Sequence, residues 1–139
     1  MSGQGVVSIH VPVAWGEQDA FGHVNNVVFF RYFENVRMHF LERIGALRSH
    51  REQGIGVILA TTTCQFEQPV HWPVDLTIST WCTHIGTTSF TLAYTIRTAT
   101  GTVVATGTSV QVAYDYIHGH KVSIPVDQRN AIGSLMGQG

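Results

Sequence analysis

The stretch that decides the fold of this chain is GEQDAFGHVNN, residues 16–26. It ends a strand-like run and leads into a long helical pattern rich in aromatic residues, so it places Asp19 just before a helix N-terminus. Free backbone N–H groups at such an end can polarise a carbonyl oxygen, and a nearby carboxylate can attack or activate water. This pairing suits the chemistry of acyl transfer.

The helix that follows is predicted from apolar residues spaced three or four positions apart, which form one helical face. These residues are Phe29, Phe33, Val36, Phe40 and Ile44. Asn25 or Asn26 is a natural N-cap, and Gly45 follows the last apolar residue as a stop signal. The helix should therefore run for about 18 residues, or roughly 27 Å.

Strand-like alternation precedes and follows this helix. The first run covers residues 7–13, and Pro12 within it indicates an edge strand or a bulge. Four more runs lie at about 57–66, 76–83, 90–96 and 104–114, with short turns at 85–87 and 100–101. A short helix is predicted after Pro125, at about 126–136, with 133–139 as a loose tail. Because no helix separates the later strands, we expect an α+β domain over residues 1–139, with a five-stranded antiparallel sheet wrapped around the long helix.

Composition limits the possible functions. Only 12% of the 139 residues are charged, against about 25% in a typical domain, which suggests that another subunit covers part of the surface. A net charge of −1 predicts neither nucleic-acid nor membrane binding. Cys64 and Cys82 show no metal or redox spacing, and His118 and His120 lack a third ligand, so no metal is expected. With no signal peptide and no apolar run of roughly 18 residues, a cytoplasmic protein is expected.

Several motifs resemble those of one family. The segment Asp19 to Asn26 reads DAFGHVNN, which is similar to the Asp-x-x-Gly-His-Val-Asn-Asn motif of hotdog-fold acyl-CoA thioesterases of the 4-hydroxybenzoyl-CoA thioesterase type. RYFENVR at 31–37, HIGTTS at 84–89 and SIP at 123–125 fit the same family. The resemblance covers about residues 8–132 and implies hydrolysis of an acyl-CoA without a cofactor.

The resemblance also implies residue roles. Asp19 would act as nucleophile or general base on the thioester carbon, and the backbone N–H of Asn26 would hold the thioester oxygen. His23 is a third candidate catalytic residue, which either orients the substrate or caps the loop. The active site would lie between two subunits of a homodimer, and such dimers often pair into tetramers. The chain departs from some relatives at Phe21, where plant acyl-carrier-protein thioesterases carry asparagine, and at Phe29, where many members carry tyrosine.

The expected substrate-binding positions lie in three parts of the chain: Gly22, Asn25, Phe29, Phe33, Gly86, Thr87, Thr88, Ser89 and Lys121. Each has a simpler structural reading as a cap, a core aromatic, an ordinary hairpin or a solubilising lysine. For Asp19 we expect partial burial with local hydrogen bonds, because strong burial would keep the carboxyl protonated. Glu17, two residues earlier, reads as a solvated loop carboxylate.

Other functions stay open at this stage. A non-catalytic acyl-thioester binder or sensor would retain the fold, and a carrier-protein thioester would be an alternative substrate to acyl-CoA. A hotdog hydratase would need a different Asp and His arrangement, which this chain does not present. The acyl chain, the residues that bind the coenzyme A phosphates and the choice between dimer and tetramer stay open.

Overall fold

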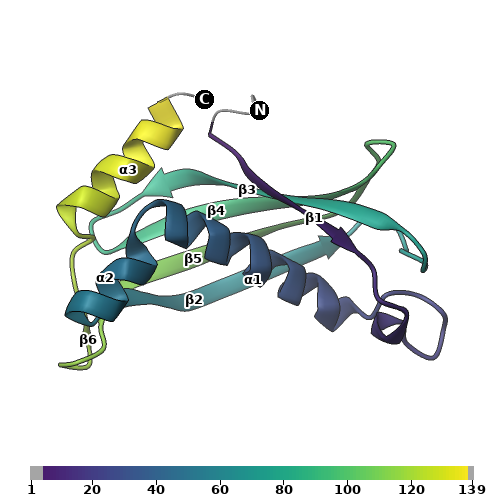
Figure 1. The fold of residues 1–139 in the computed structure, drawn as a ribbon, viewed down its shortest axis with the longest axis horizontal. Coiled ribbons are helices and arrows are strands. Elements are labelled where there is room, and N and C mark those ends of the chain that lie inside the picture. The colour runs from purple at the N-terminus through teal and green to yellow at the C-terminus, as the bar shows by residue number, and fades with distance from the viewer. Residues whose placement is uncertain (1–4, 138–139) are drawn as a thin grey trace.

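The computed structural model describes residues 5–137, and it shows one antiparallel sheet with a long helix lying on one face (Figure 1). The strands are β1 (Val7–Pro12), β2 (Ile55–Phe66), β3 (Asp75–Ile85), β4 (Ser89–Thr98), β5 (Val103–Asp115) and β6 (His120–Lys121). Their spatial order is β1-β3-β4-β5-β2, and the two-residue β6 pairs with β5. All pairings are antiparallel, so the predicted five-stranded sheet is confirmed.

The long helix, α1 (Asn26–Arg43), has the predicted 18 residues. Asn25 is its N-cap, and the side-chain oxygen of Asn25 accepts the backbone N–H of Val27 at 3.1 Å. The predicted apolar face is buried, and it packs on the inner face of the sheet, where the largest fully buried aliphatic side chains are Leu76, Ile78, Leu92 and Ile96. Burying each such side chain contributes about 1.5–3 kcal/mol, so this contact anchors α1 firmly.

The sheet has two edges of very different length. β1 is an edge strand of six residues, and Pro12 at its end lies opposite Asp75. An edge position suits Pro12, because proline has no N–H to donate to a neighbouring strand. β2 is the other edge and is twice as long, with 12 residues. Ile58 and Leu59 on β2 are each 42% exposed. Within residues 5–137, this long edge pairs with β5 on one side only, so it presents backbone groups without a strand partner beside apolar side chains.

The structure differs from the sequence prediction in two helical segments. A second helix, α2 (Ala46–Gln53), follows α1 directly after Gly45, and it was not predicted. The C-terminal helix, α3 (Val126–Gly137), confirms the helix predicted at about 126–136, but the loose tail expected from 133 is wrong, because residues 133–137 are helical. Residues 138–139 lie outside the described residues. Ile132 is fully buried and Leu135 nearly so, and these two contacts hold the last turns of α3 in place.

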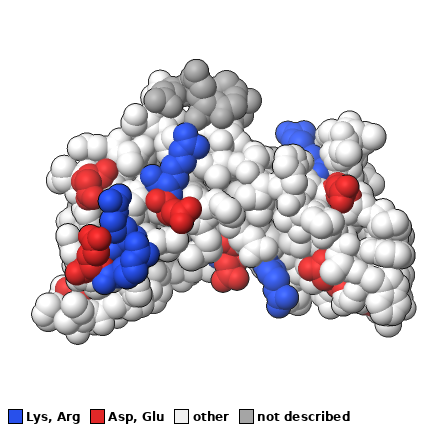
Figure 2. All heavy atoms as spheres, viewed as in Figure 1, with Lys and Arg blue, Asp and Glu red and all other residues white. Residues whose placement is uncertain are grey.

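The surface is sparsely charged, as the composition predicted. Figure 2 shows charged side chains scattered over one face of the molecule with wide uncharged areas between them. Among the described helices, none is long and apolar enough to span a bilayer.

Candidate active site

The loop before α1 is closed by hydrogen bonds within itself. The N–H of Asp19 donates to the carbonyl oxygen of His23 at 2.8 Å, and the N–H of Gly22 donates back to the carbonyl of Asp19 at 3.1 Å. Gly22 has a φ of 79°, a left-handed conformation that favours glycine. The N–H of Asn25 donates to the carbonyl of Glu17 at 2.9 Å, which fixes the loop against the start of the helix.

Asp19 lies at the tip of this loop and is exposed in the isolated chain. The expected partial burial is therefore wrong for a single chain, because no other segment within residues 5–137 covers this side chain. The expected local hydrogen bond is confirmed: Oδ1 accepts the backbone N–H of Phe21 at 2.9 Å. This bond orients the carboxylate, and within residues 5–137 the structure records no partner for Oδ2.

The start of α1 offers one unused donor. Asn25 accepts two N–H groups of the first turn, from Val27 on its side chain and from Val28 on its carbonyl. The N–H of Asn26, the first helical residue, donates to no acceptor among residues 5–137. First-turn N–H groups have no partner inside a helix, so this one is free to bind a ligand oxygen.

A cleft of about 410 Å³ joins the loop to the helix start. Its lining comes from the loop, from the first turn of α1 and from the segment after β2, and comprises Asp19, His23, Val24, Asn26, Phe29, Phe66, Glu67, Gln68, Pro69 and Val70. Four of the predicted site residues thus meet in one cleft. The wall at 66–70 was missed, because a proline-containing connection gives no signal of the segment it folds against.

This connection between β2 and β3 also braces the loop. The N–H of Val24 donates to the carbonyl of Val70 at 2.7 Å. The carbonyl of Gly22 lies 3.2 Å from Nδ1 of His71, and because a carbonyl only accepts, Nδ1 carries the proton. The rings of His23 and His71 meet edge to face with centroids 4.6 Å apart. His23 is therefore held at the cleft wall by a partner that sequence reasoning missed.

Glu17 is built into the structure and is not the solvated carboxylate that was expected. Its Oε1 accepts the Tyr32 hydroxyl at 2.8 Å and the backbone N–H of Ala14 at 2.8 Å. Tyr32 is 1% exposed, and burial together with the Glu17 carboxylate raises the pKa of its hydroxyl well above the usual value. This contact ties the loop to the second turn of α1.

The two predicted pocket aromatics have different places. Phe29 lines the cleft and packs against Phe66, with ring centroids 5.3 Å apart. Phe33 does not line the cleft; it is fully buried and stacks on Tyr94 with centroids 4.5 Å apart. A Cβ on Gly107 of β5 would come within 2.5 Å of the Phe33 ring, so Phe33 occupies a close-packed core position.

The remaining predicted positions lie at the opposite end of the sheet. Gly86 to Thr88 form the turn between β3 and β4, and Ser89 is the first residue of β4. Arg129 of α3 donates to the carbonyl of Gly86 in this turn at 2.6 Å. Lys121 lies in β6, near the same end (Figure 1). One chain therefore does not bring these positions to the Asp19 cleft.

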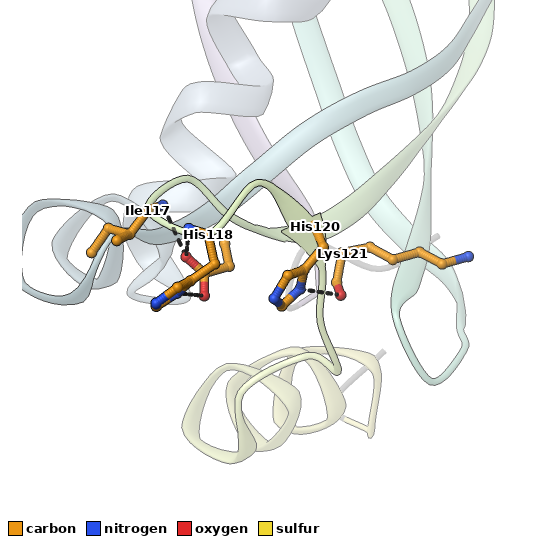
Figure 3. Close-up of polar contacts among 5 residues, drawn as sticks. Ile117, His118, His120 and Lys121 are labelled. Atoms are coloured by element: carbon orange, nitrogen blue, oxygen red, sulfur yellow. Dashed lines mark hydrogen bonds and ion pairs between the residues drawn. The ribbon is translucent and has the colours of Figure 1, made fainter.

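Around Lys121, polar contacts stabilise the turn that precedes β6. The Asp115 carboxylate accepts the backbone N–H groups of Ile117 and His118, and it lies 2.8 Å from Nδ1 of the His118 ring. These bonds lower the pKa of Asp115 to about 2, and the backbone N–H of His118 makes the largest contribution. Figure 3 shows the Lys121 side chain directed away from the imidazoles of His118 and His120. No cluster of three metal-ligating side chains occurs in the part of the chain that the structure describes.

The chain is similar to several known proteins over most of its length. A Bacillus subtilis protein, YsmA, is 28% identical over 122 residues, which are 88% of this chain and 82% of that protein. A gentisyl-coenzyme A thioesterase, BH1999, is 25% identical with a TM-score of 0.80, covering 90% of this chain and 98% of that one. A DHNA-CoA thioesterase from Staphylococcus aureus superposes with a TM-score of 0.85 at 15% identity, covering 95% and 91% of the two chains.

An antiparallel sheet curled around one central helix is the hotdog fold, which the solved thioesterases share. The chain belongs to the thioesterase-like superfamily, which matches residues 13–132. Hydrolysis of acyl-CoA thioesters is the general class of reaction that this family and these relatives support.

Proposed function

We propose that the protein hydrolyses acyl-CoA thioesters with Asp19 as the acting carboxylate and the N–H of Asn26 as the donor to the thioester oxygen. The observation that carries this proposal is the shared cleft, which Asp19 and Asn26 line together while the Asn26 N–H has no acceptor in the described residues. A donor preset where negative charge develops stabilises the transition state, and removing one such donor costs about 10²–10³ in rate in other enzymes.

Two routes fit this geometry. In the first, an Asp19 oxygen bonds to the thioester carbon, the C–S bond breaks, and coenzyme A leaves as a thiolate that takes a proton from solvent. Water then hydrolyses the acyl-aspartyl anhydride to the free acid and the Asp19 carboxylate. In the second, Asp19 takes a proton from a water molecule whose oxygen attacks the carbon, the same C–S bond breaks, and the leaving thiolate takes up the proton from Asp19 or from solvent. In both, charge gathers on the carbonyl oxygen beside Asn26. Support for Asp19 comes from its place in the cleft lining and from the Phe21 N–H, which orients Oδ1.

The functional unit that we propose is a two-fold dimer. The Asp19 cleft and the 86–89 turn lie at opposite ends of strands of 10–13 residues, a separation of roughly 30–40 Å. One substrate can therefore contact both the Asp19 cleft and the 86–89 turn only if a second, antiparallel subunit supplies one of them. The free edge of β2, with its exposed apolar Ile58 and Leu59, is the surface suited to this pairing.

The dimer proposal is tested by measuring the molecular mass of the protein in solution. Light scattering after size exclusion should give twice the chain mass for the wild type. Ile58→Glu places a charge on the β2 edge and should shift the protein to a monomer with lost activity, whereas Ser8→Glu on the exposed β1 edge should leave the mass unchanged. A monomeric wild type that hydrolyses substrate would contradict the shared site.

The reaction itself is tested by thiol release. The wild-type protein is assayed with aliphatic and aromatic acyl-CoAs and with acyl-carrier-protein thioesters, and release of the thiol is followed with a chromogenic disulfide. Release from acyl-CoAs is the expected result. Tight acyl-CoA binding with no release from any member of the panel would instead indicate an acyl-thioester sensor.

A further inference from the structure

Arg37 in the middle of α1 is a buried cation, and no carboxylate within residues 5–137 forms an ion pair with it. It is 8% exposed, and its Nη1 donates to the Tyr94 hydroxyl at 3.1 Å. Tyr94 is in turn 2.6 Å from the Ser109 hydroxyl, so the recorded partners are neutral. Among residues 5–137 the structure records one ion pair, between His118 and Asp115, and it is remote from Arg37. Burying a charge without a counter-charge costs free energy, so a bound anion would stabilise this buried guanidinium.

Arg37 lines a second cavity, of about 280 Å³, between α1 and the β2 edge. The remaining lining is Val27, Phe30, Arg31, Glu34, Leu59 and Thr62. Two arginines and one glutamate therefore line the cavity, and the net charge of the lining residues is positive. Apolar side chains on the α1 and β2 sides form a wall that fits a hydrocarbon segment leading to the charged end.

The second cavity adjoins the catalytic cleft. Phe66 lines the cleft, Phe30 lines the second cavity, and their ring centroids are 6.5 Å apart. Asn26 and Val27, which are consecutive in α1, also line one cavity each. For an acyl group whose carbonyl sits at the helix start, the second cavity is therefore the neighbouring space along α1.

The distance along the helix sets the length of such an acyl group. Arg37 follows Asn26 by eleven positions, which is about 16 Å of helix axis. Side chains of helical residues lean toward the N-terminus, which brings the guanidinium closer, to roughly 10–16 Å. Extended chains advance roughly 1.2 Å per bond, so a span of about 8–13 bonds reaches Arg37 from the carbonyl carbon.

We propose that this second cavity selects acyl groups of medium length that end in a carboxylate, with Arg37 as the group that binds that carboxylate. The proposal rests on the proposed thioesterase function and names its substrate class. A competing anion is Glu34 of a second copy of the chain. In a two-fold dimer, however, each pair of cavities would hold four guanidinium groups and two such carboxylates, so the net charge would stay positive.

The test compares matched substrates. The mono-CoA thioester of decanedioic acid differs from decanoyl-CoA only in its terminal carboxylate, and succinyl-CoA and butyryl-CoA form a matched pair too short to reach Arg37. The wild type should prefer the carboxylate in the long pair by at least about 10-fold in kcat/KM, as expected for one charge-assisted hydrogen bond. It should show no such preference in the short pair.

Variants connect the preference to Arg37. Arg37→Met keeps the length of the side chain and leaves the Tyr94 hydroxyl bonded to Ser109, so the fold should persist. The long-pair preference should fall by about 10- to 100-fold in this variant and return partly in Arg37→Lys. Arg48→Met, on the exposed side of α2, is the matched control and should keep the wild-type ratio.

Three outcomes would overturn the inference. The first is equal wild-type kcat/KM for the two long substrates. The second is a long-pair preference that Arg37→Met leaves intact. The third is that Arg37→Met and Glu34→Gln each dissociate the dimer while the ratio of kcat/KM for the two long substrates stays at the wild-type value. That result would show that Arg37 pairs with Glu34 of the second copy. If no thioester is cleaved at all, the proposed function fails separately. Thermal stabilisation by decanedioate over decanoate, lost in Arg37→Met, would still support the anion site, and its absence would refute it.

Discussion

The contact between Tyr32 and Glu17 gives a prediction whose size follows from the structure. Tyr32→Phe removes one hydrogen bond to a carboxylate, and such bonds contribute about 1.5–3 kcal/mol. Glu17 is only partly buried and keeps its bond from the Ala14 N–H, so the lower end, about 1.5 kcal/mol, applies. Unfolding a chain of 139 residues has an entropy of about 0.3 kcal/mol/K, which converts this loss into a Tm decrease of about 5 °C.

The assay is thermal unfolding of Tyr32→Phe, Glu17→Gln and the double variant. Because the two side chains share the bond, their effects should be less than additive. Tyr114→Phe is the control, since the structure records no hydrogen bond for the Tyr114 hydroxyl within residues 5–137. If Tyr32→Phe lowers the Tm no more than Tyr114→Phe does, or if its effect adds fully to that of Glu17→Gln, the hydrogen bond between Tyr32 and Glu17 does not stabilise the fold as argued.

The pH dependence gives an independent check on the same contact. The pKa of Tyr32 is raised in the folded state, so the folded protein holds this proton more tightly than the unfolded chain does. The associated stability is fully present below about pH 10, the unfolded pKa, and is lost as the pH rises above it. Wild-type Tm should therefore decline above pH 10 more steeply than the Tm of Tyr32→Phe.

Three further predictions concern packing, acid stability and thiols. Gly107→Ala should destabilise the fold by about 1–3 kcal/mol in urea unfolding, because its Cβ would clash with a buried ring of α1; an unchanged midpoint would contradict that packing. The backbone N–H of His118 is the main cause that lowers the pKa of Asp115 to about 2 in the folded protein. The stability that the Asp115 carboxylate contributes above about pH 4 should therefore be lost as the pH falls toward 2, and Asp115→Asn should flatten this part of the profile of Tm against pH. Burial raises the pKa of Cys64 to about 11 and also raises that of Cys82, so both thiols should react with a disulfide reagent at pH 8 only after unfolding.

Much of the fold was predictable because its signals are local and strong. Five large apolar residues at helical spacing define the buried face of α1, and the observed helix starts at the predicted cap. Pro12 correctly identified an edge strand, because a residue without an N–H is excluded from the sheet interior.

The missed segments lacked such signals. α2 reads ALRSHREQ and buries only Ala46 and Ser49, which are too small and too weakly apolar to mark a helical face. The end of α3 contains Gly133 and Gly137, which suggested a loose tail, whereas its order comes from distant packing of Ile132 and Leu135. Local propensity carries no information about such tertiary contacts.

The candidate site was predictable in part for the same reason. The motif at 19–26 located the loop and the free N–H of Asn26, since both depend on residues close in sequence. The exposure of Asp19, the wall at 66–70 and the bond from His71 depend on what folds against the loop. The sequence pattern of the loop itself does not contain that information.

The most direct test of the central claim is turnover of acyl-CoA by Asp19→Asn. Removing a positioned carboxylate should lower kcat by at least about 100-fold. The Tm and the affinity for coenzyme A should stay near wild type, because Asp19 is exposed and makes one local bond. Asp127→Asn, an exposed carboxylate on α3, serves as the control and should keep full turnover. A folded Asp19→Asn protein that releases thiol at the wild-type rate would contradict the account.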